Sequence, residues 1–151
     1  MVIDHVNMRL YTHPKLRITV EEINNIPYIK EVWRGVLNPD VFRDLINTSL
    51  DVYAKEIKKH KITGQNKFLL YADVTELEMI RQEEITWLDT EINPQYEKLG
   101  FTHQAVLSPI TQLASNKVEE YHSNEDDAPF VTKVFKDHKK ALKWFLDDSS
   151  K

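Results

Sequence analysis

Polar side chains that can bind a ligand or accept a phosphate follow two segments that we predict to be buried strands. Asp73 and Thr75 come directly after the apolar residues 68–71, and Ser108 follows the apolar segment 103–107. Since the carboxyl ends of parallel strands meet at one edge of an open sheet, where ligands bind, these three residues predict a recognition edge. The structural alternative is that Thr75 and Ser108 are N-caps, because each stands where a helix is predicted to begin.

Nucleophilic catalysis is the chemical alternative for Ser108. A serine nucleophile needs a histidine and an oxyanion donor within reach, and the nearest histidine in the sequence is His103, on the same predicted strand. The G-x-S-x-G motif of many hydrolases does not occur in the chain. A serine hydrolase is therefore an alternative interpretation, while a protein without catalytic activity is the prediction.

The histidines are not spaced as metal ligands, and the chain carries no motif for a cofactor. None of the six histidines forms an H-x-H or H-E-x-x-H motif, and they fall in different predicted elements. The chain has no cysteine, which excludes thiolate ligands, disulfides and thiol catalysis. It has three glycines and no glycine-rich phosphate-binding motif. We predict neither a metal nor a cofactor.

Four large aromatic side chains predict either an apolar pocket or a contact surface. They are Trp33, Trp87, Tyr96 and Trp144. Indole rings at helical spacing also pack in cores and at subunit contacts, so a homodimer is one assembly that fits this set. A small apolar ligand is the occupant that a pocket of these rings would take.

The composition is that of a soluble globular protein, with 41% apolar and 29% charged residues. The formal net charge of −4 argues against binding to nucleic acid, whose phosphates attract a basic surface. No segment approaches the roughly 20 apolar residues of a membrane helix. The first ten residues also lack the apolar core of a signal peptide. We predict a cytoplasmic protein that is not an integral membrane protein.

An apolar segment at residues 67–73 predicts the central strand of an α/β domain, because a row of large apolar side chains indicates a strand covered on both faces. Thr75 and Glu78 match a capping box, which places the start of the following helix at residue 76. The other predicted strands are residues 16–23, 27–36, 103–107 and 130–135. The predicted helices are residues 39–60, 76–92 and 110–121, a turn at 95–99 closed by Gly100, and a final helix capped by Asp137.

The order β-β-α-β-α-β-α-β-α predicts a single α/β domain with a mixed, mostly parallel sheet of about five strands flanked by helices. The first two strands form an antiparallel hairpin that turns at Asn24-Asn25, since asparagine tolerates left-handed backbone angles. Residues 16–147 form the domain and residues 148–151 a tail. Residues 1–15 form an N-terminal extension in which residues 8–11 are a candidate strand.

Several segments of the chain resemble the SpoIIAA-like, or STAS/SEC14-type, proteins of bacteria, which are related to the STAS domains of anti-sigma-factor antagonists. The similar segments are Trp33-Arg34-Gly35, FLLYAD at residues 68–73, residues 100–109, and Phe135 with ALKWF at residues 141–145. The resemblance extends over residues 16–147. It implies the same α/β fold and a regulatory role that consists of binding.

The phosphorylated turn of the SpoIIAA-type antagonists has no counterpart in this sequence. Those proteins carry an Asp-Ser-Ser-Gly-like turn at the start of the second helix, and the matching residues 73–80 here contain neither serine nor glycine. Thr75 is the one hydroxyl there. We predict a non-catalytic regulatory or ligand-binding module without the phosphoserine switch, whose partner is a protein or a small apolar ligand. A small-molecule or lipid-binding protein is the first alternative and a serine hydrolase the second.

Overall fold

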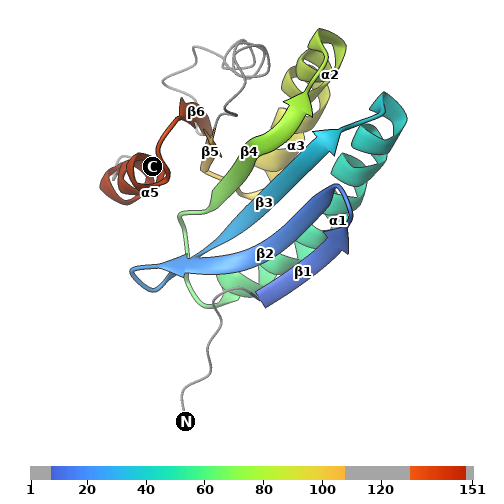
Figure 1. The fold of residues 1–151 in the computed structure, drawn as a ribbon. Coiled ribbons are helices and arrows are strands. Elements are labelled where there is room, and N and C mark those ends of the chain that lie inside the picture. Colours follow the sequence, from blue (N-terminus) through green and yellow to red (C-terminus); the bar gives the residue numbers. More distant parts are fainter. Residues whose placement is uncertain (1–7, 108–129, 149–151) are drawn as a thin grey trace.

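The computed structural model describes residues 8–107 and 130–148, apart from the side chain of Met79. Six strands form one sheet in the order β1-β2-β3-β4-β5-β6. The strands are β1 (Met8–His13), β2 (Leu16–Ile23), β3 (Ile26–Val36), β4 (Leu69–Met79), β5 (His103–Leu107) and β6 (Val131–Phe135). The helices are α1 (Pro39–Ile62), α2 (Gln82–Trp87), the π-helix η1 (Leu88–Ile92), α3 (Asn93–Leu99) and α5 (His138–Asp147). Figure 1 shows α1, α2 and α3 on one face of the sheet and α5 beside the other.

The sheet is mixed, as the sequence predicts. β1, β2 and β3 pair antiparallel, whereas β3, β4, β5 and β6 pair parallel. The sixth strand is β1, which pairs with β2 and lies within the residues predicted to form an N-terminal extension. The sheet therefore begins before residue 16.

The turn between β2 and β3 has the backbone geometry that its two asparagines predict. Asn24 and Asn25 have φ angles of 50° and 67°, in the left-handed region. Two consecutive residues with positive φ form the primed turn whose twist matches that of an antiparallel hairpin. The register of β2 on β3 follows from this turn, since Ile23 pairs with Ile26.

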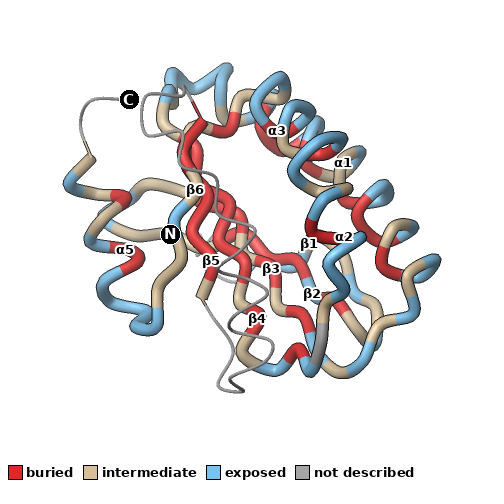
Figure 2. Tube along the Cα trace, turned by 90° about the horizontal axis from the view of Figure 1, so that it is seen from above, coloured by how far each residue is buried: buried red, intermediate tan, exposed pale blue. Residues whose placement is uncertain are grey.

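The central strand is covered on both faces, which confirms the prediction from its apolar run. Leu70 and Ala72 pack in the core on the side of α1, and Leu69 and Tyr71 pack in the core on the side of α5. Figure 2 shows the buried strands β3, β4 and β5 between α1, α2 and α3 on one side and α5 on the other. Alternate side chains of β4 thus hold the two helical layers on one sheet.

β4 continues to Met79, so the predicted helix start at residue 76 is wrong. Thr75 and Glu78 lie inside this strand and form no capping box. The backbone N–H and the hydroxyl of Thr75 both donate to Asp73 Oδ1, at 3.0 and 2.7 Å. Thr75 is therefore bonded to its own strand and caps no helix.

Pairing with a long neighbour explains the extension of β4. β3 has 11 residues and pairs with β4 as far as Val36 and Met79. This pairing supplies partners for backbone groups that a helix cap would otherwise satisfy. Val74 and Leu77 are also buried in the core on the side of α1. Long-range pairing and burial override the local capping signal here.

The segment predicted as one helix at residues 76–92 contains the end of β4 followed by two short helical elements, α2 and η1. α3 follows them directly from Asn93 and ends at Gly100, whose φ of 119° closes the helix as predicted. α1 and α5 begin at their predicted caps, because the side chains of Asn38 and Asp137 accept backbone N–H groups at 2.8 Å. The helix predicted at residues 110–121 lies outside the described residues.

Leu70 tests the role of the central strand. It is fully buried, so Leu70→Ala removes methyl groups and leaves a cavity, and we expect the free energy of unfolding to fall by about 3 kcal/mol. Ile62→Ala is the control, because Ile62 is 80% exposed and its truncation costs at most about 0.5 kcal/mol. Urea denaturation measures both values, and equal losses in the two variants would contradict a central position for β4.

Candidate functional site

A cavity of about 60 Å³ lies between the sheet and the helices that cover its α1 face. Side chains from β3, β4, β5, α1, α2, η1 and α3 line it, so it lies where the helical layer meets the sheet. Most of the lining is aliphatic or aromatic. The polar side chains in the lining are Glu31, Gln104, Tyr96 and, through its indole N–H, Trp33.

Glu31 is the unusual member of this lining, because it is a carboxyl group on the buried face of a strand. It alternates along β3 with Ile29 and Trp33, which point into the same core, and it is 3% exposed. Trp33 Nε1 donates to Glu31 Oε1 at 2.8 Å. The hydroxyl of Tyr53, a fully buried residue of α1, donates to Glu31 Oε2. Both carboxyl oxygens are therefore hydrogen-bonded, one from the strand itself and one from the helix above it.

Burial changes the proton affinity of this pair. It raises the pKa of the Glu31 carboxyl, although the hydrogen bonds from Tyr53 and Trp33 act in the opposite direction. Burial, together with the neighbouring Glu31 carboxyl, also raises the pKa of the Tyr53 hydroxyl well above its ordinary value. The two groups hold their protons more tightly than they would in water.

The four aromatic residues predicted to form a pocket or interface do not lie together. Trp33 and Tyr96 line the cavity. Trp87 packs against the Phe42 ring in a T-shaped arrangement, with ring centroids 6.2 Å apart, and so lies beside the cavity that Phe42 lines. Trp144 lies on the opposite face of the sheet, where it packs on Phe135. The sheet separates this set into two clusters.

Asp73 and Thr75, two of the residues predicted to form a recognition edge, lie away from the cavity. Asp73 stands where the pairing of β4 with β5 ends, opposite Leu107. Asp73 and Thr75 alternate with Ala72 and Val74, which line the cavity, so they face the α5 side of the sheet. Ser108 lies outside the described residues.

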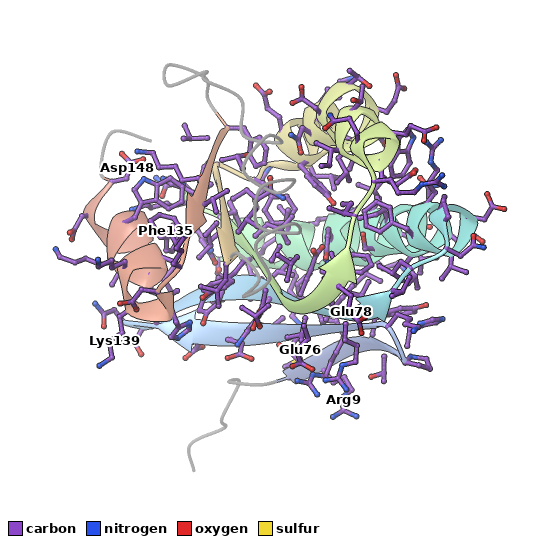
Figure 3. All side chains as sticks on the ribbon, turned by 45° about the horizontal axis from the view of Figure 1, so that its top comes forward. Arg9, Glu76, Glu78, Phe135, Lys139 and Asp148 are labelled. Carbon is purple, nitrogen blue, oxygen red and sulfur yellow. The ribbon has the colours of Figure 1, made fainter. Side chains whose placement is uncertain are left out.

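A second polar cluster fastens α5 to the sheet. The imidazole of His103 is fully buried, with Nε2 2.9 Å from Asp148 Oδ2 and Nδ1 2.7 Å from the Thr102 hydroxyl. The rings of Trp144 and Phe145 lie about 5 Å from the imidazole, at 5.1 and 5.2 Å between centroids. Figure 3 shows Asp148 and Phe135 on this side of the sheet. The cluster joins β5 to the end of the last helix.

Sequence reasoning did not single out Glu31 or Tyr53. The signal was present, because a glutamate stands between Ile29 and Trp33 on the apolar side of an alternating strand. A charged residue at such a position is buried and needs partners. Tyr53 belongs to the apolar stripe of α1, where its hydroxyl is the matching donor.

The described residues contain no group of three histidine, aspartate or glutamate side chains placed to hold a metal ion. Within the same residues, no helix is both long and apolar enough to cross a membrane.

One solved structure places this chain in a known fold. It is an uncharacterized protein of the DUF3478 family with a SpoIIAA-like fold from Shewanella loihica PV-4, and it matches with a TM-score of 0.58 and 19% sequence identity. The match covers 87% of this chain and 94% of that chain. No family model and no curated protein matches the chain. The chain thus has the SpoIIAA-like fold that its sequence resemblance implied, while its partner, assembly and cytoplasmic location stay predictions.

Glu31 gives the stability a defined dependence on pH. The pKa of Glu31 is raised in the folded state, so the protonated carboxyl stabilises the fold. This stabilisation is complete below the pKa of the unfolded chain, about 4.3, and is lost as the pH rises through the pKa of the folded protein. Glu31→Gln keeps the shape and removes the charge. We expect its free energy of unfolding, relative to the wild type, to rise between about pH 4 and about pH 8.

Chemical denaturation at the two pH values measures this difference. Glu76→Gln is the control for the loss of a carboxylate, because the Glu76 side chain is 60% exposed and lies outside the core. If the free energies of unfolding of the wild type and of Glu31→Gln changed in parallel with pH, this result would contradict the burial of a titrating carboxyl at residue 31.

Proposed function

We propose that this chain is a non-catalytic, ligand-binding regulatory module whose ligand site is the cavity beside Glu31. The observation that carries the proposal is a buried carboxyl group at the wall of a largely apolar cavity. Ligand sites in proteins combine an apolar lining with a few polar groups that fix the orientation of the ligand. Glu31, Gln104 and Tyr96 are groups of this kind.

The size of the cavity favours a small ligand over a lipid. Its volume of about 60 Å³ is far below the roughly 300–1,000 Å³ of pockets that hold drug-sized molecules. A lipid chain would need the helices to separate from the sheet, whereas a molecule of a few heavy atoms fits the packing that exists. The proposed ligand is therefore a molecule of a few heavy atoms and not a lipid.

The absence of catalysis is supported by the surroundings of His103. This imidazole joins a hydroxyl and a carboxylate, the groups that a hydrolase combines. The His103 imidazole faces neither solvent nor the cavity, because its exposed fraction is 0% and it is not part of the cavity lining. Its partner Asp148 joins it to the end of α5. A substrate carbonyl cannot reach it in this packing, so the cluster is better explained as structural.

The regulatory part of the proposal rests on the position of the cavity. A ligand there contacts β3 and β4 on one side and α1, α2 and α3 on the other. It changes the free energy of the packing of these helices on the sheet, which is the physical basis of a response at the surface. A protein partner that reads this response is part of the proposal.

Titration with 1-propanol tests whether the cavity binds. The indole N–H signal of Trp33 in a ¹⁵N-labelled protein should shift with saturation, because Trp33 lines the cavity, while the signal of Trp144, on the other face of the sheet, stays nearly constant. We expect a dissociation constant no tighter than about 40 μM, because the four heavy atoms of 1-propanol gain at most about 1.5 kcal/mol each, or about 6 kcal/mol together. Trp87→Phe and Trp144→Phe assign the signals.

Ala72→Val is the matched variant, because it adds two methyl groups at the cavity wall on a strand that favours β-branched residues. It should abolish the shift while the variant remains as stable as the wild type. Equal shifts of all three indole signals, or the same shift in Ala72→Val, would rule out the cavity as the ligand site.

A further inference from the structure

We propose that the cavity binds a small alkylammonium ion, held by the Glu31 carboxylate and the aromatic rings around it. This inference rests on the proposed function, since it names the class of ligand for the same site. Three properties of the lining support it: the hydrogen-bonding capacity of the carboxylate, the distribution of charge, and the position of the rings.

The carboxylate has acceptor positions beyond those used by its two partners. An ionised carboxylate offers about four lone-pair sites. Trp33 and Tyr53 occupy one on each oxygen. Because Glu31 lines the cavity, a ligand inside it that carries N–H groups can donate to the remaining sites. An ammonium group has donors alone and suits this acceptor.

The charge of the lining favours a cation. Among the described side chains that line the cavity, Glu31 is the one that carries a formal charge when ionised, and no lysine, arginine or histidine lines it. A buried charge is stable when it is paired, and here the lining provides no cationic partner. An alkylammonium ligand supplies that partner, whereas an anion would add a second negative charge beside the first.

Aromatic rings provide a further attraction for a cation. Trp33, Phe42 and Tyr96 line the cavity, and the rings of Trp33 and Phe42 lie 5.2 Å apart. The face of an aromatic ring attracts an ammonium group within about 6 Å, and desolvation strengthens the attraction. A carboxylate next to aromatic rings is therefore a setting for an alkylammonium ion.

The volume limits the length of the alkyl group. A cavity of about 60 Å³ has room for a probe of a few heavy atoms. Ethylammonium is accordingly the probe of choice. Ethanol is its neutral counterpart of the same length, and acetate is the anionic counterpart.

The experiment compares the three probes at equal ionic strength by the shift of the Trp33 indole signal. We expect ethylammonium to bind at least about tenfold more tightly than ethanol, and acetate to give no saturable shift. Glu31→Gln should remove the preference for ethylammonium while ethanol still binds. Glu56→Gln is the matched control, because Glu56 is a buried glutamate bonded to His60 and does not line the cavity, so its variant should keep the preference.

The other outcomes separate the ligand class, an alkylammonium ion, from the ligand site, the cavity beside Glu31. Saturable binding of ethanol without a preference for ethylammonium overturns the ligand class and leaves the cavity as a binding site. A preference that persists in Glu31→Gln also overturns the inference. Failure of all neutral and charged probes overturns the inference and the proposed function together. If Glu31→Gln does not fold, Ala72→Val decides, because it keeps the carboxyl and closes the cavity: unchanged ethylammonium binding in that variant would overturn the site.

Discussion

The burial of the Glu31 carboxyl under α1 is the constraint on which the packing of the helical layer depends. A carboxyl group in an apolar core is costly unless donors satisfy it, and Trp33 and Tyr53 provide one donor for each oxygen. Tyr53 belongs to α1 and the other two residues to β3. The hydrogen bond between helix and strand therefore fixes where α1 lies on the sheet, and the cavity lies next to this contact.

The two faces of the sheet serve different purposes. The face under α1, α2 and α3 holds the cavity and the buried carboxyl. The opposite face carries α5, which is fastened through His103 and Asp148. β4 belongs to both, because its alternate side chains enter one core or the other. In the proposed function, a ligand in the cavity acts on one helical layer, while α5 covers the other face of the sheet.

Local patterns predicted those parts of the fold whose causes are local. The apolar run of the central strand, the Asn24-Asn25 turn and the caps at Asn38 and Asp137 each depend on neighbouring residues. Pairing with a distant strand decided the end of β4, so the capping pattern at Thr75 was misleading. The site around Glu31 likewise depends on contacts between distant parts of the chain. Sequence can mark a glutamate inside an apolar alternation, but the donor that meets it and the cavity beside it arise from how α1 packs on β3.

The ionisation of Glu31 is the most direct measure of this account. A ¹³C NMR titration of the glutamate side-chain carboxyls follows each group separately. We predict that the Glu31 signal titrates above the ordinary glutamate value of about 4.3 and that Tyr53→Phe shifts its midpoint. A Glu31 signal with its midpoint at or below that ordinary value would show that water reaches the carboxyl, and would contradict its burial.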